Sequence, residues 1–339
     1  MARRQVRALF DLVAGFVYAQ ILSACVELDL FEKLAQGPQS AADLAPRLAL
    51  AEPAADRLLK AAAALDLCQV LPDGRYTLGS LGAALRGNPG VAAMIRHHAL
   101  LYADLTDPLA MLRGELANPR LQQFWAYARS ANPAASAPDQ VGDYSALMAA
   151  SQAMVAGEVL DAYPLSRHRR LLDVGGGEGV FLTAAGLRHP HLALTLFDLP
   201  AVTERARRKL AEAGLAGRAS IVAGSFFDDD LPRGADIVAL VRVLHDHDDG
   251  AALTILRHVR AALDAGGVLL LAEPMAGTKG ARPAGDAYFG FYLAAMGSGR
   301  PRTVAEQTAL LRQAGFDHVR LLSTHTPLIV RVMTARAKL

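Results

Sequence analysis

Two histidines and three aspartates stand together in the stretch "VLHDHDD", residues 243–249. Imidazole and carboxylate groups transfer protons, and both are common metal ligands. The spacing matches no standard metal site, so we expect no metal ion and interpret Asp248 and Asp249 as acids at the start of a helix. His245 follows an apolar run and therefore ends a strand, where it either acts in catalysis or caps the next helix.

A glycine-rich turn, "LLDVGGGEG", occupies residues 171–179 between an apolar run and a helix-like pattern. Glycines in such a turn let the backbone approach a ligand, and the start of the next helix offers free N–H groups. Gly175 and Gly177 fit the first two places of a dinucleotide-binding motif, but Val180 holds the third. The pattern that remains is D-x-G-x-G-x-G, beginning at Asp173.

A further acid, Asp198, ends the next strand candidate in "LTLFDLP". An acid at this place can accept hydrogen bonds from both ribose hydroxyls of an adenosine cofactor. No P-loop lysine follows the glycines, which disfavours a phosphate cradle. Together the two motifs indicate S-adenosylmethionine, an adenosine cofactor without a pyrophosphate, bound by Asp173, Gly175, Gly177 and Asp198.

The elements that position these residues alternate between strands and helices from about residue 169 onward. The strand candidates are "RLLDVG", "LALTLFD", "ASIVAG", "ADIVALVRVL", "GGVLLLAEP", "HVRLLST" and "PLIVRVMTA". Apolar runs of this kind are typical of a parallel sheet covered on both faces, with ligands at the carboxyl ends of the strands. Only "HT" separates the last two runs, which predicts an antiparallel pair at one edge of a doubly wound α/β domain.

The first 87 residues indicate two helices followed by a hairpin, which is a winged-helix-like pattern. Ser40 and Asp43 form a capping box, and Pro72-Asp73-Gly74 marks the hairpin turn. The second helix, 52–66, carries three acids against two basic residues, so it does not suit DNA, and we expect no nucleic-acid partner. We interpret this part as a structural or dimerisation domain. Residues 88–165 are mostly helical and are expected to contribute to a substrate pocket, and 166–339 form the cofactor-binding domain.

The first helix, "LFDLVAGFVYAQILSACV", is apolar on most faces, which predicts burial against a second copy in a homodimer. Its apolar run is shorter than a membrane span needs, and Asp11 interrupts it with no convincing cleavage site after it. The chain has 339 residues, of which 52% are apolar, and a net charge of +2, as expected of a cytoplasmic globular protein. Cys25 and Cys68 fit no metal or redox spacing and are expected to be reduced core residues.

Three motifs in order, "LLDVGGGEG", "LTLFDLPAV" and "RVLHDHDDG", resemble those of the class I small-molecule O-methyltransferases, the plant-type and acetylserotonin-like family. The resemblance covers nearly the whole chain, including the winged-helix-like dimerisation domain. The stretches "MIRHHALLYADLTDP" and "GDAYFGFYLAAMGSGRPRT" are similar to the branch of bacterial carotenoid hydroxyl methyltransferases, which act on demethylspheroidene or hydroxyneurosporene. The resemblance implies a Rossmann-like methyltransferase fold and S-adenosylmethionine as the cofactor.

The resemblance also implies roles for two residues at strand ends. It places the catalytic base at His245 and an acid that orients the base at Glu273, after "LLLAE". His247 stands where many relatives have Trp, and we expect it to shape the pocket. Pro301 stands where plant relatives have a second orienting Glu, so Glu273 must act alone or with Asp246.

Other departures from the family lie in the cofactor site. Gly224-Ser225-Phe226 replaces the Gly-Asp-Met that grips the adenine in plant relatives. Ser225 can still form a hydrogen bond and Phe226 can pack on the purine, but carboxylate recognition is lost. Arg242 replaces a Lys, and either can reach the carboxylate or the backbone of the cofactor.

Aromatic and methionine side chains are frequent where the acceptor pocket is expected. They include Tyr144, Met148, Phe289, Tyr292 and Met296. As a group they suit a long apolar, lipophilic acceptor with one hydroxyl. The resemblance to the carotenoid branch implies that this hydroxyl is the tertiary 1-hydroxyl of an acyclic carotenoid, and such a substrate implies transient contact with a membrane surface. The open alternatives are a phenolic or polyketide acceptor, a chlorin carbon, an NAD-dependent oxidoreductase, and a methyltransferase-fold scaffold or regulator.

Overall fold

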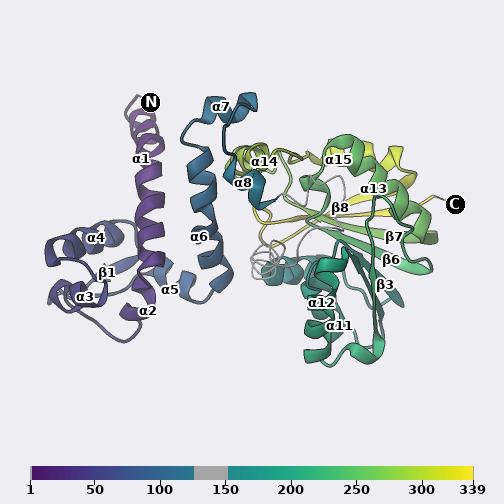
Figure 1. The fold of residues 1–339 in the computed structure, drawn as a ribbon, viewed down its shortest axis with the longest axis horizontal. Coiled ribbons are helices and arrows are strands. Elements are labelled where there is room, and N and C mark those ends of the chain that lie inside the picture. Colours follow the sequence, from purple (N-terminus) through teal and green to yellow (C-terminus); the bar gives the residue numbers. More distant parts are fainter. Residues whose placement is uncertain (1, 126–151, 339) are drawn as a thin grey trace. The chain divides into compact units, whose positions relative to one another are not determined.

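The computed structural model describes residues 2–125 and 152–338 (Figure 1). The chain divides into two compact units, Met1–Ala99 and Leu100–Leu339. Each unit has its own buried apolar core, as expected for a chain of this length. The domain boundaries expected at residues 87 and 165 stay predictions.

The first unit is helical with one small hairpin. Its elements are α1 (Ala2–Glu27), α2 (Leu30–Leu34), α3 (Ala41–Arg47), α4 (Glu52–Ala64), β1 (Cys68–Val70), β2 (Tyr76–Leu78), α5 (Ser80–Arg86) and the start of α6 (Pro89–Asp104). The Ser40–Asp43 capping box at the start of α3 is confirmed, as is the antiparallel hairpin around Asp73. Cys25 and Cys68 are free thiols in this core, and burial raises their pKa values to about 12 and about 11, respectively.

Helix α1 leaves a broad apolar face exposed within its own chain. Leu12 is 79% exposed and Phe16 is 70% exposed. Among the described residues, α1 contains the one segment, Arg4–Glu27, that is long and apolar enough to cross a membrane, with mean hydropathy 1.8. The expectation that its apolar run is too short for a span is therefore wrong, because the helix continues through residues beyond the run. An apolar helix that a partner subunit covers has the same length and composition.

The second unit is built on a seven-stranded sheet. Its strands lie in the order β5 (Ala219–Ala223), β4 (Ala193–Asp198), β3 (Arg170–Val174), β6 (Ala235–Val241), β7 (Leu263–Glu273), β9 (Arg331–Ala337) and β8 (Phe316–Leu322). The first five are parallel, whereas β9 runs antiparallel to β7 and to β8. Strand order reverses around β3, so the carboxyl ends of β3 and β6 border the crevice where ligands bind in doubly wound sheets.

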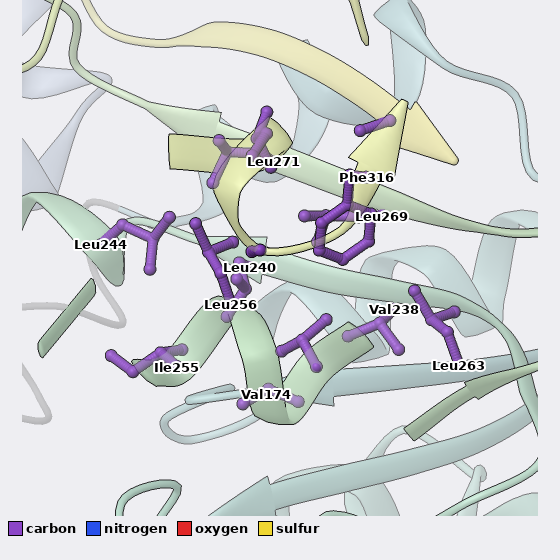
Figure 2. Close-up of a cluster of buried hydrophobic side chains, with 14 of the residues drawn as sticks. Val174, Val238, Leu240, Leu244, Ile255, Leu256, Leu263, Leu269, Leu271 and Phe316 are labelled. Carbon is purple, nitrogen blue, oxygen red and sulfur yellow. The ribbon is translucent and has the colours of Figure 1, made fainter. Parts of the chain in front are cut away.

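Both faces of this sheet are covered by helices, as the uninterrupted apolar runs predict. Leu171 packs on the face covered by α11 (Val180–Arg188), α12 (Pro200–Glu212) and the helix at 152–162, while the next residue, Leu172, packs on the opposite face. That opposite face is covered by α13 (Asp249–Ala262) and α15 (Val304–Gln313). Side chains of α13, β6 and β7, such as Leu256, Leu240 and Leu271, lie in one buried cluster (Figure 2). Successive side chains of a strand point to opposite faces, so both faces need apolar residues.

The predicted antiparallel pair at one edge is confirmed, but its connection is longer than "HT". Residues 323–330 join β8 to β9, so "PLIV" lies in the connection instead of the strand. A side-chain oxygen of Glu158 accepts hydrogen bonds from the backbone N–H groups of His325 and Thr326 at 2.8 and 3.1 Å. The next residues form a turn, in which the N–H of Ile329 donates to the carbonyl of Thr326 at 3.0 Å, so "PLIV" does not extend β9.

Candidate active site

His245 lies in a tight turn after β6, so the expectation that it ends the strand is wrong: β6 ends at Val241. Arg242 adopts a left-handed backbone conformation, with φ +59°, and its N–H donates to the carbonyl of Ala272 in β7 at 2.8 Å. The chain then forms a short 3₁₀ turn, Leu244–Asp246, anchored by the fully buried Leu244 side chain. The turn buries His245 at the carboxyl edge of the sheet, where its exposed fraction is 5%.

Glu273 ends β7 beside this turn and is completely buried. Its Oε1 accepts hydrogen bonds from the N–H groups of Val243 and Leu244 at 3.0 and 2.8 Å, and its Oε2 lies 2.5 Å from His245 Nδ1. A carboxylate at Nδ1 favours the tautomer with a proton on Nδ1 and leaves Nε2 as the ring's basic nitrogen. The expected pairing of His245 with Glu273 is present in the geometry.

Asp246 faces the other ring nitrogen. Its Oδ1 lies 3.1 Å from His245 Nε2, so the imidazole stands between two carboxylates. Burial disfavours the charged ring, but Asp246 and Glu273 outweigh it and raise the pKa of His245. Burial, together with the charge of Glu273, raises the pKa of Asp246 against the effect of His245. The pair therefore holds a proton more tightly than an ordinary histidine would.

The remaining polar residues of the stretch have different environments. The ring of His247 packs edge-on against Phe226 and Phe227, with centroids 5.5 and 5.4 Å away, and burial lowers its pKa to about 4. It is therefore neutral near pH 7 and forms part of an aromatic wall. Asp248 is the N-cap residue of α13 and Asp249 is in its first turn, as predicted. No cluster of metal-ligating side chains occurs within residues 2–125 and 152–338.

The glycine loop follows β3 at the same edge of the sheet. Gly175 has φ +68°, and a Cβ there would lie 2.9 Å from Val243 Cγ2, so only glycine fits between the loop and the turn before His245. Gly177 has φ +57°, and a Cβ there would meet no atom within 4 Å. The loop is therefore packed against the protein on one side and open at Gly177, where a ligand can approach the backbone.

Two carboxylates lie next to this loop. Asp198 accepts hydrogen bonds from the N–H groups of Gly177 and Leu199, each at 2.7 Å, while burial raises its pKa to about 6 against the effect of these donors. Burial and the charge of Asp198 raise the pKa of Asp173 to about 8. Asp173 Oδ2 is one of the buried side-chain atoms in the described part of the chain with no hydrogen-bond partner. Each oxygen of Asp198 keeps a lone pair for a hydroxyl donor, so this acceptor-rich edge fits the ribose and amino groups of S-adenosylmethionine.

Ser225 follows β5 and is held by two aspartates. Its Oγ donates to Asp228 Oδ2 at 2.9 Å, and its N–H donates to Asp229 Oδ2 at 2.8 Å. Asp228 and Asp229 thus fix the position of Ser225, and the expected loss of carboxylate recognition at the adenine stays a prediction. Phe226 Cε1 is 3.7 Å from the Cβ position of Gly175, so the Phe226 ring borders the glycine loop.

The predicted pocket residues are not equivalent. The Phe289 ring stands edge-on to His245 with centroids 6.3 Å apart. Tyr292 is buried and its hydroxyl accepts a hydrogen bond from Trp125 Nε1 at 3.2 Å, and Met296 is completely buried in the same apolar cluster. Phe289 thus contacts the ring of His245. Burial raises the pKa of Tyr292 and the charge of Asp246 raises it further, so Tyr292 also lies close to the turn. Tyr144 and Met148 lie outside the described residues.

Sequence reasoning missed the role of the segment before α15. Arg302 is completely buried and contacts the turn that carries His245. The signal in the sequence was weak: an arginine in "GRPRT" has no local pattern that predicts burial. The better clue was the presence of two glycines nearby, Gly297 and Gly299. Glycine readily adopts positive φ, and both residues do so in the structure.

Comparison with known proteins agrees with this geometry. Residues 102–317 match the family model of an O-methyltransferase domain, and residues 10–86 match that of an O-methyltransferase dimerisation domain. The chain is 46% identical to the demethylspheroidene O-methyltransferase of Cereibacter sphaeroides, covering 99% of this chain and 88% of that protein. Among solved structures, the mitomycin 7-O-methyltransferase MmcR has a TM-score of 0.81 at 27% identity, covering 99% of both chains. The structure of PigF with SAH has a TM-score of 0.77 at 26% identity, covering 97% and 99% of the two chains.

Proposed function

Because this chain belongs to the S-adenosylmethionine-dependent O-methyltransferases, we propose that its acceptor is the tertiary 1-hydroxyl of an acyclic carotenoid. The observation that carries the chemistry is the buried His245 between Glu273 and Asp246, at the edge of the sheet that also carries the glycine loop. The acceptor class is supported by the 46% identity to a demethylspheroidene O-methyltransferase over nearly the full chain. It is also supported by the aromatic side chain of Phe289 beside His245.

The protein's part in the reaction is to orient the acceptor and remove its proton. The cofactor supplies a methyl group on a sulfonium, which is transferred in line to the acceptor oxygen. An aliphatic alcohol is a poor nucleophile, so we assign His245 Nε2 as the base that takes the hydroxyl proton. Glu273 keeps Nδ1 protonated and balances the positive charge that the ring gains. Asp246 faces Nε2 in the structure, so the acceptor hydroxyl must share or replace that contact.

The cofactor is assigned to the loop and carboxylates at the ends of β3, β4 and β5. Asp198 would accept hydrogen bonds from the ribose hydroxyls, and Asp173 has a buried oxygen available for a donor. The open backbone of Gly177 would lie along the cofactor, with Gly175 holding the loop against the turn. We assign Ser225 and Phe226 to contacts with the adenine. We assign Arg242 as the cation near the carboxylate of the cofactor.

The acceptor pocket is assigned to the region around α14 (Phe289–Met296). Tyr288 and Phe289 contact each other there, and burial raises the pKa of Tyr288 to about 12, so its hydroxyl stays neutral. Such a lining binds a hydrocarbon by burial of apolar surface and makes few polar demands on it. A phenolic or polyketide acceptor is the second candidate, since relatives such as MmcR act on other small molecules.

Dimer formation is assigned to the first unit, and contact with a membrane is inferred from the substrate. The match to a dimerisation domain and the exposed apolar face of α1 support a homodimer in which a second copy covers this face. We propose that the dimer is cytoplasmic and visits the membrane surface transiently, because a carotenoid acceptor partitions into the bilayer.

The test is a direct competition between acceptor classes. The purified enzyme and methyl-labelled S-adenosylmethionine are incubated with liposomes that carry a 1-hydroxy carotenoid and, in parallel, with a panel of phenols. Label in a methoxy carotenoid, absent with His245→Gln, is the expected result. Label in phenols alone would refute the carotenoid assignment and leave the methyltransferase activity intact.

A further inference from the structure

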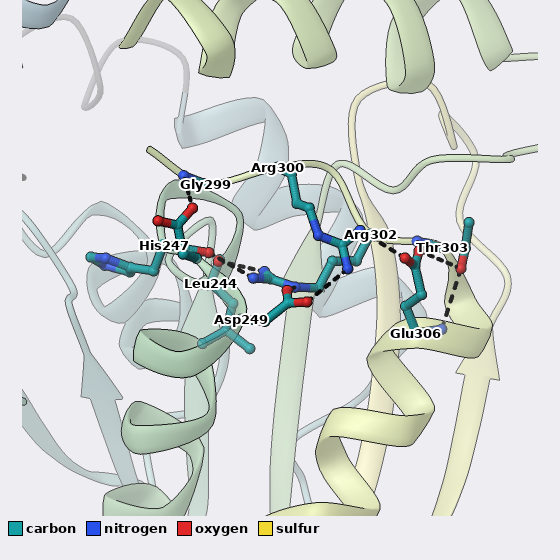
Figure 3. A network of polar contacts seen from close by, with 9 residues as sticks. Leu244, His247, Asp249, Gly299, Arg300, Arg302, Thr303 and Glu306 are labelled. Carbon is teal, nitrogen blue, oxygen red and sulfur yellow. Dashed lines mark hydrogen bonds and ion pairs between the residues drawn. The ribbon is translucent and has the colours of Figure 1, made fainter. Parts of the chain in front are cut away.

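The turn that carries His245 is held by hydrogen bonds from a segment that lies about fifty residues further along the chain. This segment connects α14 to α15 and includes Ser298, Gly299 and Arg302, which we call the strap (Figure 3). The strap crosses the turn on the side where the backbone carbonyl groups of the turn lie. Three of the four carbonyls from Leu244 to His247 receive hydrogen bonds from strap side chains.

At Gly299 the strap fits the turn too closely to allow any residue but glycine. Ser298 Oγ donates to the carbonyl of Asp246 at 3.0 Å, and the N–H of Gly299 donates to Asp248 Oδ1 at 3.0 Å. Gly299 has φ +78°, and a Cβ there would lie only 2.1 Å from the carbonyl oxygen of His245. The backbone of the strap is therefore in direct contact with the backbone of the histidine.

Arg302 provides the strongest contacts. Its guanidinium donates through Nη1 to the carbonyl of Leu244 at 2.7 Å and through Nη2 to that of His247 at 2.6 Å. Its Nε donates to Asp249 Oδ1 at 2.8 Å, which supplies the opposite charge. The planar fork thus joins the residue before His245 to the start of α13, and a lysine ammonium cannot reproduce this fixed geometry.

A completely buried arginine that bonds two backbone carbonyls is costly to misplace. If its donors move, the carbonyls of Leu244 and His247 lose their partners inside the protein, which costs more than the hydrogen bonds themselves stabilise. The turn has little other freedom, because Glu273 holds the N–H groups of Val243 and Leu244 from the opposite side. The histidine is thus fixed through its neighbours' N–H groups on one side and their carbonyls on the other.

We propose that Ser298, Gly299 and Arg302 are positioning residues that set the orientation of the His245 ring relative to Glu273 and Asp246. This inference rests on the proposed role of His245 as the base. The charged or titratable groups that face the ring are Glu273, Asp246, Arg242 and His247. A change in the turn alters the distances from the ring to these groups, and therefore changes both its titration and its reach to the acceptor hydroxyl.

The test compares Arg302→Lys and Ser298→Ala with Arg300→Ala. Arg300 is the matched control: it pairs with the same Asp249 at 3.0 Å but is half-exposed, and its second ion-pair partner is Glu306 in α15. Methyl transfer is measured with liposomes carrying a 1-hydroxy carotenoid. Titration of the His245 imidazole is followed by NMR of histidine-labelled enzyme, with the resonance identified by its absence from His245→Gln.

We expect Arg302→Lys to lower kcat about tenfold to a hundredfold, the scale of a misplaced catalytic group, with less effect from Ser298→Ala. Both variants should shift the midpoint of the His245 titration while keeping the wild-type affinity for S-adenosylmethionine. Arg300→Ala should keep the wild-type rate and the wild-type His245 titration. A His245 titration unchanged in both variants, or a rate loss that follows only the folded fraction, would overturn the proposal. If Arg302→Lys does not fold, Ser298→Ala decides. Full activity of His245→Gln would instead refute the base assignment, and the NMR titration would still decide whether the strap positions the ring.

Discussion

The exchange Glu273→Gln tests the proposed catalytic pair with almost no change in shape. The glutamine carbonyl oxygen can still accept the N–H groups of Val243 and Leu244, as Glu273 Oε1 does. Its amide nitrogen then faces His245 Nδ1 and donates to it. Nδ1 must therefore become an acceptor, the ring proton moves to Nε2, and the nitrogen that should take the acceptor's proton is already protonated.

The size of the effect follows from these contacts. Loss of a general base costs about two to four decades in rate, and a wrong histidine tautomer falls at the upper end of that range. We expect about three decades in kcat, or roughly 4 kcal/mol at about 1.36 kcal/mol per decade. Stability should change by less than about 2 kcal/mol, because weaker hydrogen bonds to the two N–H groups are offset by the removal of a completely buried charge.

The assay is label transfer from saturating S-adenosylmethionine to the carotenoid in liposomes, with cofactor affinity from calorimetry. Asp264→Asn is the matched control, because this acid lies in the same strand but its side chain is half-exposed and pairs with Arg170. The double variant with His245→Gln should be no slower than the slower single variant, since the two residues act as a unit. A loss below tenfold, or additive losses in the double variant, would refute the reasoning.

Three further predictions follow from the same geometry. Asp198→Ala should weaken S-adenosylmethionine binding by about 1–3 kcal/mol in calorimetry, and unchanged affinity would remove Asp198 from the cofactor site. The base must be neutral to act and its pKa is raised, so kcat should rise with pH through a midpoint above the ordinary histidine value. Asp246→Asn removes one raising charge and should move that midpoint to lower pH; a midpoint that stays in place contradicts the geometry. Leu12→Asp with Phe16→Asp should yield monomers in sedimentation, and an intact dimer would refute the α1 interface.

Much of the sheet was predictable because its signal is local. The apolar runs placed the seven strands, and the ends of those runs placed Asp173, Asp198, His245 and Glu273 at one edge, where parallel strands bring their carboxyl ends together. The capping box at Ser40 was predictable for the same reason. Its two hydrogen bonds join residues three positions apart, so the pattern is complete within one short segment.

The features that the sequence did not predict depend on contacts between distant segments. "PLIV" has mostly strand-forming residues, but in the structure it lies in a turn closed by the hydrogen bond from Ile329 N–H to the carbonyl of Thr326, next to residues that Glu158 caps. The carboxylate beside Ser225 comes from Asp228, which a comparison of aligned positions would not identify. Arg302 can be buried because carbonyls 58 and 55 residues earlier accept its hydrogen bonds. No periodicity in "GRPRT" encodes that environment.

The departure at Pro301 shows how far the site differs from a two-acid clamp. The sequence indicated that a second orienting acid was missing, and the structure places Asp246 at Nε2 and Arg302 on the neighbouring carbonyls. An acid that orients a ring through a side-chain contact also adds a negative charge to it, whereas contacts to the backbone fix the position of the ring without that charge. In this chain, positioning can therefore come from the strap, while the charge that stabilises the imidazolium comes from Glu273 and Asp246. Asp246→Asn should therefore move the pH midpoint with little loss of kcat at its high-pH plateau, whereas Arg302→Lys should lower that plateau as well as move the midpoint.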